Sequence, residues 1–207
     1  MNRTFAALTG AAAAMLFACA PAQAELERFA ELVCGENKIC FHVWPKLPAV
    51  PGWHTDEATN YKRDVNTLVP DGFTFGDAET VIYSNAIFKE DYGKDNPGAN
   101  TLEGFIENDK KGFIESNPSP EISEIEPFTT GDGEKLRTFS FKGVNKNNDE
   151  IVVYGEEHGY YTVFVISSRS KAGLENGLAT FKDLMSRYKV GADNDPNNYT
   201  IVKPGSE

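Results

Sequence analysis

The sequence has few of the residues that most enzymes use as general bases, nucleophiles or metal ligands. Its 207 residues include only three histidines and three cysteines. It has no Gly-x-Ser-x-Gly elbow, no glycine-rich phosphate or dinucleotide fingerprint and no paired zinc ligands. No residue is therefore predicted to be catalytic, cofactor-binding or metal-binding, and no cofactor is expected. Binding is favoured over catalysis, although an enzymatic role stays open.

Positive charge is also scarce. The chain has 20 Lys and Arg against 31 Asp and Glu, which gives a formal net charge of −11 at pH 7. Contacts with phosphates need clustered Lys and Arg side chains. The composition therefore disfavours nucleic acid and anionic membrane surfaces as partners, and the acidity is typical of a protein that is kept soluble after export.

Long apolar runs are missing too, and the one extended apolar segment lies at the N-terminus. It runs over residues 5–20, follows the positively charged Arg3 and precedes Pro21. This run is shorter than the roughly 18 apolar residues of a membrane-spanning helix. Together with the small residues Ala22 and Ala24 it has the organisation of a signal peptide. We predict that residues 1–24 are removed by cleavage between Ala24 and Glu25.

The predicted leader has consequences for location. Its removal leaves a chain without a further membrane anchor, so no stable membrane insertion is expected, and the periplasm is the predicted compartment. An extracellular location is an alternative. A lipoprotein attached through Cys19 is a third reading, disfavoured because the bulky Phe17 stands where lipoprotein signals usually have a small or branched residue.

Two cysteines follow the leader, Cys34 and Cys40, with five residues between them. In an oxidising compartment this close pair predicts one disulfide that closes a small loop and contributes about 2 kcal/mol. Metal binding by the cysteines with His42 is an alternative, and a nucleophilic cysteine is another.

Four segments follow from the pattern of the chain: the signal peptide over 1–24, a lead-in over 25–52, a single domain over 53–190 and a flexible tail over 191–207. The lead-in is predicted to hold a short helix over Glu25–Val33, the disulfide loop and an extended, proline-rich crossover. Trp44, Trp53 and His54 at this crossover are a candidate interaction patch.

The domain over 53–190 has short alternating apolar runs, typical of strands, and two longer segments with helical spacing. Strands are predicted over 60–68, 80–88, 122–128, 136–144, 150–157 and 160–168, and the two helices over about 100–116 and 173–189. His158-Gly159 predicts a tight hairpin, and the apolar strand 161–166 should lie centrally. The fold class is α+β, an antiparallel sheet flanked by two main amphipathic helices.

This order of elements, with the turn Leu68-Val69-Pro70-Asp71-Gly72-Phe73 near its start and the closing helix around Phe181, resembles the PsbP-like family. The family includes a Ran-binding branch and bacterial periplasmic branches. The resemblance implies an α/β/α sandwich, and it implies an interaction, assembly or accessory protein rather than an enzyme. The resemblance does not extend to the Cys34–Cys40 loop or the proline-rich crossover.

The remaining polar motifs are not interpreted as catalytic or metal-binding sites. His158 falls in the predicted turn, and His54 has no second histidine near it. The acidic segment 193–197 starts like a calcium loop but has neither its glycine nor its terminal glutamate.

Two functions are left open for this acidic domain. The first is an exported, noncatalytic module that binds a protein partner in the cell envelope. The alternative is a periplasmic protein that binds a small ligand or a metal.

Overall fold

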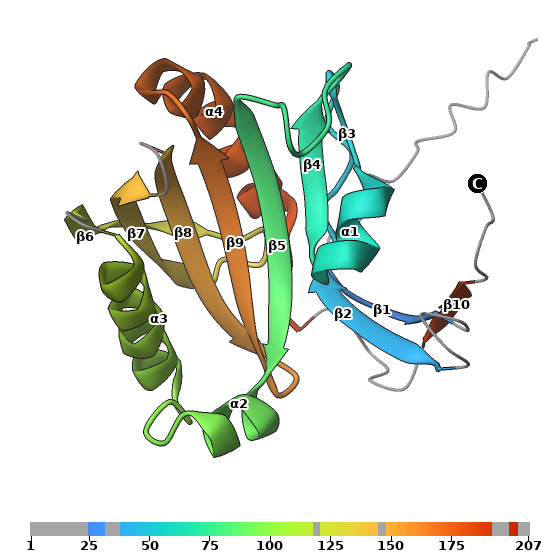
Figure 1. Ribbon diagram of the computed structural model, residues 1–207, viewed down its shortest axis with the longest axis vertical. Helices are drawn as coiled ribbons and strands as arrows, with labels where there is room; N and C mark the ends of the chain where they lie inside the picture. Colours follow the sequence, from blue (N-terminus) through green and yellow to red (C-terminus); the bar gives the residue numbers. More distant parts are fainter. Residues whose placement is uncertain (1–24, 32–37, 118–120, 145–147, 192–198, 203–207) are drawn as a thin grey trace, which may run out of the picture.

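The computed structural model describes residues 25–31, 38–117, 121–144, 148–191 and 199–202 (Figure 1). In chain order its elements are β1 (Leu26–Glu31), β2 (Cys40–Pro45), β3 (Trp53–His54), α1 (Glu57–Arg63), β4 (Asn66–Pro70), β5 (Thr80–Phe88), α2 (Lys89–Asp95), α3 (Leu102–Ser116), β6 (Glu121–Thr129), β7 (Lys135–Val144), β8 (Asn148–Glu157), β9 (Tyr160–Ser168), α4 (Lys171–Arg187) and β10 (Thr200–Val202).

The main structure is a seven-stranded sheet in the order β3-β4-β5-β9-β8-β7-β6. Every neighbouring pair is antiparallel. β9, the most apolar strand, occupies the central position, as its composition predicted. The α+β class with an antiparallel sheet is thus confirmed, although the described part of the chain contains four helices rather than two main ones.

The β8–β9 hairpin closes at the predicted residues. His158 and Gly159 both have positive φ, 46° and 83°, and Glu157 pairs with Tyr160 on either side of them. Two central residues with positive φ match the right-handed twist of the strands. This turn fixes the register of the two strands and thereby sets which side chains share a face of the sheet.

One face of the sheet is covered by α4, which lies behind the strands in Figure 1. Ser170 caps this helix by accepting a hydrogen bond from the backbone N–H of Gly173 at 2.9 Å. Apolar residues fill the space between helix and sheet: Leu68, Ile82, Phe128, Ile151, Val153, Phe164, Ile166, Phe181, Leu184, Met185 and Tyr188. This face is a filled core.

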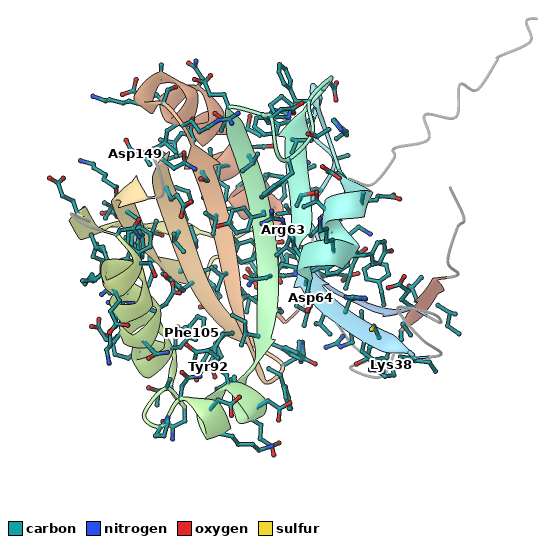
Figure 2. The ribbon with its side chains drawn as sticks, viewed as in Figure 1. Lys38, Arg63, Asp64, Tyr92, Phe105 and Asp149 are labelled. Carbon is teal, nitrogen blue, oxygen red and sulfur yellow. The ribbon has the colours of Figure 1, made fainter. Side chains whose placement is uncertain are left out.

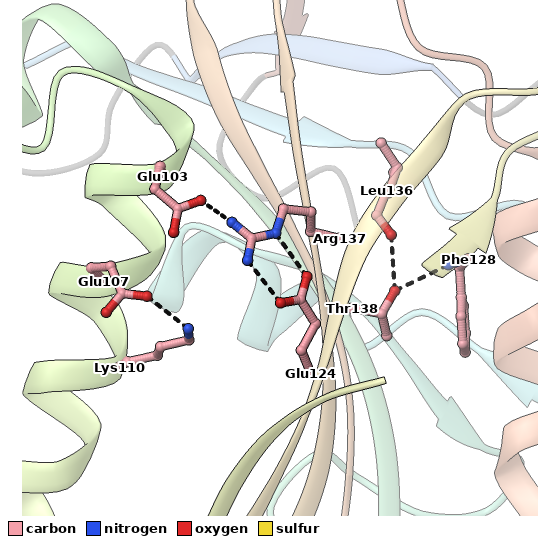
Figure 3. Close-up of polar contacts among 8 residues, drawn as sticks. All are labelled: Glu103, Glu107, Lys110, Glu124, Phe128, Leu136, Arg137 and Thr138. Carbon is pink, nitrogen blue, oxygen red and sulfur yellow. Dashed lines mark hydrogen bonds and ion pairs between the residues drawn. The ribbon is translucent and has the colours of Figure 1, made fainter. Parts of the chain in front are cut away.

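The opposite face is covered in part by α3, which begins at the cap Thr101 rather than at the predicted Asn100. Arg137 of β7 connects this helix to the sheet (Figure 3). Its guanidinium donates two hydrogen bonds of 2.9 Å to Glu124 of β6 and also pairs with Glu103 of α3. The start of α3 is therefore held by ion pairs at the protein surface.

A β-bulge interrupts the β6–β7 pairing between Ile125 and Phe128. Beside it, the Thr138 hydroxyl accepts a hydrogen bond from the Phe128 N–H at 3.1 Å and donates one to the Leu136 carbonyl at 3.0 Å (Figure 3). The buried threonine thus satisfies backbone groups that the irregular pairing leaves free.

The lead-in differs from its prediction. The segment predicted as a helix is the strand β1, which pairs antiparallel with β2 and parallel with β10. Its apolar residues Leu26, Phe29 and Ala30 have helical spacing, but the segment pairs with β2 and with β10, which is remote in the sequence. β10 also corrects the prediction that the whole segment 191–207 is a flexible tail.

The predicted strand over 60–68 is wrong in its first half, which forms α1. Asp56 caps this helix by accepting a hydrogen bond from the N–H of Thr59 at 3.1 Å, and Asp64 ends it in a left-handed conformation with φ 54°. The Asn60 side chain then accepts hydrogen bonds from the Thr67 N–H and hydroxyl, 2.9 and 2.6 Å, which ties the helix to β4. The short helix α2 was not predicted.

None of the helices in the described ranges is long and apolar enough to cross a bilayer.

Candidate ligand-binding groove

The middle strands β8, β9 and β5 have one face that no helix covers completely. In Figure 1, α3 lies in front of the sheet at the left and α1 lies at the right, with these three strands between them. In Figure 2, Arg63 marks the α1 side of this surface, and Phe105 and Tyr92 mark the α3 and α2 side. The side chains between these limits form two adjoining cavities.

The first cavity lies against α3 and α2 and has a volume of about 370 Å³. Five aromatic and four aliphatic residues line it: Tyr83, Ile87, Tyr92, Phe105, Phe113, Phe141, Val152, Val163 and Val165. Three polar residues complete the lining, Asn85, Asp109 and Glu150. Its size, and a lining in which nine aromatic or aliphatic residues surround three polar ones, are typical of a small-molecule site.

The second cavity adjoins the first on the α1 side and has a volume of about 390 Å³. Tyr83 and Glu150 line both cavities, so the two adjoin at these side chains. Arg63 lies over the ring of Phe75, 5.3 Å from its centroid, at the outer wall. We call the two cavities together the sheet groove.

Strand register explains why these side chains meet. Side chains at alternate positions of a strand point to the same face. Tyr83 of β5 pairs with Val165 of β9, which in turn pairs with Val152 of β8. Two positions further along β5, Asn85 pairs with Val163, so the polar amide lies on the same apolar surface.

Two carboxyl groups face the groove. Asp109 lies at its rim on α3 and accepts a hydrogen bond of 2.5 Å from the hydroxyl of the fully buried Tyr154. Removal from water raises the pKa of Asp109, and the Tyr154 hydrogen bond opposes this shift. Removal from water also raises the pKa of Glu150, where a hydrogen bond with Ser167 opposes the shift and the charge of Asp109 adds to it. Both carboxyl groups therefore hold their protons more tightly than usual.

Two further polar groups complete the lining. Burial raises the pKa of Tyr83, and the charges of Glu150 and Asp109 add to the shift. Tyr83 therefore stays protonated, so its phenol can donate or accept a hydrogen bond. Oδ1 of Asn85 is buried and has no hydrogen-bond partner within the described part of the chain. Buried polar atoms are paired in most proteins, so an unsatisfied acceptor in a cavity lining indicates a place where a donor can bind.

No family model matches the chain, and no curated protein matches it. Among solved structures, the chain is similar to the Ran-binding protein Mog1p of Saccharomyces cerevisiae, with 14% identity over 70% of this chain and 80% of that one and a TM-score of 0.39. It is similar to a point mutant of the protein Mog1 at 13% identity, over 70% and 81% of the two chains, with a TM-score of 0.38. This is a fold-level resemblance, and at these TM-scores it supports no argument about function.

The predicted interaction patch is not assembled at the surface. Trp44 is 2% exposed and packs against Phe29 of β1, His42 of β2 and Tyr61 of α1. Its burial is a correction to the patch, because the strand β2 turns it inward. Trp53 is half-buried against the α4-side core, and only His54, 3.4 Å from Asp71, is exposed.

The other candidate residues lie apart from the groove. Buried His42 has its Nδ1 at 2.9 Å from Asp64 and its Nε2 at 3.4 Å from Glu31. Cys40 begins β2, whereas Cys34 lies outside the described residues, so their disulfide stays a prediction. Cys19, Ala24 and the segment 193–197 also lie outside them, and Glu25 is the first described residue. Within the described ranges, no three His, Cys, Asp or Glu side chains gather as a metal site.

The groove residues were missed because each was taken as part of a strand or helix pattern. One signal was present in α3, where Asp109 lies four residues after Phe105 and four before Phe113. A carboxylate at this spacing shares the apolar side of the helix. Asn85 of β5 and Glu150 of β8 also point toward the groove. The sequence alone does not show this, because the face that they share depends on how the strands pair.

Proposed function

We propose that the protein binds a small organic molecule reversibly in the sheet groove. The observation that carries the proposal is the combination of an aromatic-walled cavity of about 370 Å³ with the convergent polar side chains of Asn85, Asp109 and Glu150. Ligand sites usually combine a largely apolar concave surface with a few polar groups that orient the ligand. Of the two functions left open by the sequence, this geometry favours the small-ligand binder.

We further propose that binding takes place after export. The support for this step is the leader-like segment 1–24 and the net charge of −11. The periplasmic location and an envelope partner stay predictions, as does the finer description of the fold as an α/β/α sandwich. The burial of Trp44 removes one of the three side chains on which the protein-partner alternative rested.

A ligand screen by NMR tests the proposed function. We expect that some members of a chemically mixed fragment library shift the amide resonances of the ¹⁵N-labelled protein at Tyr83, Asn85 and Val165, because these residues lie on the groove surface. The substitution Asn85→Phe should abolish these shifts, since the larger side chain extends into the cavity. Asn100→Phe is the matched control, because Asn100 is exposed and does not line the groove.

The proposal is overturned if no fragment shifts these resonances, or if the fragments that bind shift residues elsewhere. It is also overturned if Asn85→Phe, shown by circular dichroism to be folded, binds as well as Asn100→Phe does.

A further inference from the structure

We infer that the ligand of the sheet groove is an organic ammonium ion with an apolar body. This inference rests on the proposed function and specifies the chemical class that the same site accepts. Three properties of the α3-side cavity carry it: the type of its hydrogen-bonding atoms, the number of its aromatic rings and the sign of its charge.

Three polar side chains of this cavity present hydrogen-bond acceptors. Asp109 and Glu150 present carboxyl oxygens, and Oδ1 of Asn85 is a buried acceptor without a partner in the described ranges. A ligand that donates hydrogen bonds satisfies these atoms, whereas a ligand with only acceptors leaves them unpaired at a cost. An ammonium group carries several N–H donors in a compact volume.

The walls of the cavity suit a cation that has an apolar body. Five of its lining residues are aromatic, and they come from β5, β7, α2 and α3. Phe113 meets Phe141 edge to face at 4.7 Å, and Tyr92 meets Phe105 in the same way at 5.0 Å. Electron-rich ring faces attract ammonium groups, while the aliphatic residues Val152, Val163 and Val165 provide apolar surface for the rest of the ligand.

The charge of the cavity has one sign. Among the described residues, those that line it include Asp109 and Glu150 but no Lys, Arg or His. Arg63 and Arg169 line the adjoining cavity, which Glu150 also lines, and Arg169 donates hydrogen bonds there to the carbonyl groups of Asp77 and Ala78. A cation between the two carboxyl groups relieves their mutual repulsion.

Three probes of similar shape test the inference by isothermal titration calorimetry: phenethylamine, 2-phenylethanol and 3-phenylpropanoate. We expect that the amine binds and that the alcohol and the carboxylate bind at least about tenfold more weakly. The double variant Asp109→Asn with Glu150→Gln should lower the affinity for the amine by about tenfold or more. Both replacements keep the side-chain shape, and the amide oxygen introduced by Asp109→Asn would still accept the Tyr154 hydrogen bond.

The matched control is Glu175→Gln, which changes the net charge in the same direction on the exposed surface of α4 and should leave the affinity unchanged. Circular dichroism establishes that each variant is folded. NMR shifts at Tyr83 and Asn85 establish in the unsubstituted protein that the amine binds in the groove.

Equal or tighter binding of the alcohol or the carboxylate in the groove would overturn the inference and leave the proposed function intact. The inference also fails if Glu175→Gln weakens amine binding as much as the double variant does, or if the amine shifts other residues. If none of the three probes binds while fragments of another class shift the groove residues, the ammonium class is wrong and the groove is still a ligand site.

Discussion

The two faces of the seven-stranded sheet are built from the same strands, but they differ in how they are covered and in how many polar side chains they hold. On the α4 face, Phe164, Phe181 and Tyr188 are at most 1% exposed and pack against aliphatic neighbours. On the α3 face, a comparable apolar surface includes the half-buried Asn85 and Glu150. The first face is organised for stability, whereas the second keeps polar groups that stability alone does not explain.

The largest expected effect on stability comes from removing a phenylalanine side chain from each face of the sheet. Phe181→Ala should lower the free energy of unfolding by about 3–5 kcal/mol, because it opens a cavity in a filled core. Phe113→Ala should cost clearly less, since Phe113 is half-buried at the edge of an existing cavity. Urea unfolding followed by circular dichroism measures both values, and equal losses would contradict the difference between the faces.

In a second comparison, a change from glycine to alanine should lower stability in α4 and raise it in α3. In α4, a Cβ atom at Gly173 would lie 2.4 Å from Oγ of Ser168 and 2.7 Å from Oγ1 of Thr80, so Gly173→Ala should destabilise by about 1–3 kcal/mol. In α3, a Cβ atom at Gly112 meets nothing within 4 Å. Gly112→Ala should stabilise by about 0.5–1 kcal/mol through its helix propensity. Thermal melts of both variants test the signs, and the prediction fails if they agree.

The third effect is a pH dependence. Because the folded-state pKa of Glu150 is raised, its ionisation lowers stability as the pH rises from its ordinary value of 4.5 through the folded-state value. Asp109 from α3 is the charged group that raises its pKa further, and Tyr83, Arg63 and Arg169 line a cavity together with it. Glu150→Gln removes this loss, so the variant should be more stable than the unsubstituted protein at neutral pH and no more stable in acid.

Urea unfolding at several pH values measures this difference, with Glu175→Gln as the control. If the free energy of unfolding still falls with rising pH in Glu150→Gln, and no longer falls once Asp109→Asn is added, the remaining pH dependence comes from Asp109. A variant that is less stable than the unsubstituted protein at neutral pH would contradict the expected sign.

The smallest expected effect concerns how α3 is attached. Arg137→Gln removes the ion pairs with Glu103 and Glu124, all of which reach the surface. The loss of stability should be smaller than the gain in Glu150→Gln, and it should shrink at high salt because exposed pairs are screened. Melting temperatures at low and high salt measure it. A loss that is independent of salt would show that Arg137 contributes by packing instead.

The sequence was sufficient for the features that depend on local pattern. The strands around Tyr83 and Val163, the turn at His158 and the helix around Phe181 follow from alternation, turn chemistry and helical spacing. Two elements were misread: β1, whose apolar residues have helical spacing and whose partner β10 is remote in the sequence, and α1, whose caps Asp56 and Asp64 went unrecognised.

The groove could not be predicted from the sequence, because it also depends on contacts between distant parts of the chain. Glu150 and Tyr83 are far apart in the chain, and they come together only because β9 pairs with both of their strands. The sequence shows Asn85 as a polar residue within an apolar strand, but the space around its side chain depends on how α3 and α2 lie over the sheet. Packing of distant elements, rather than local preference, creates the cavity.

The parallel pairing of β10 with β1 has a consequence for biosynthesis. Residues 200–202 are synthesised after strands β1 to β9, so the three-stranded sheet lacks β10 at one edge until these residues are available. The seven-stranded sheet needs nothing beyond residue 168 and can form earlier. The groove-bearing sheet can therefore assemble before β10 joins β1.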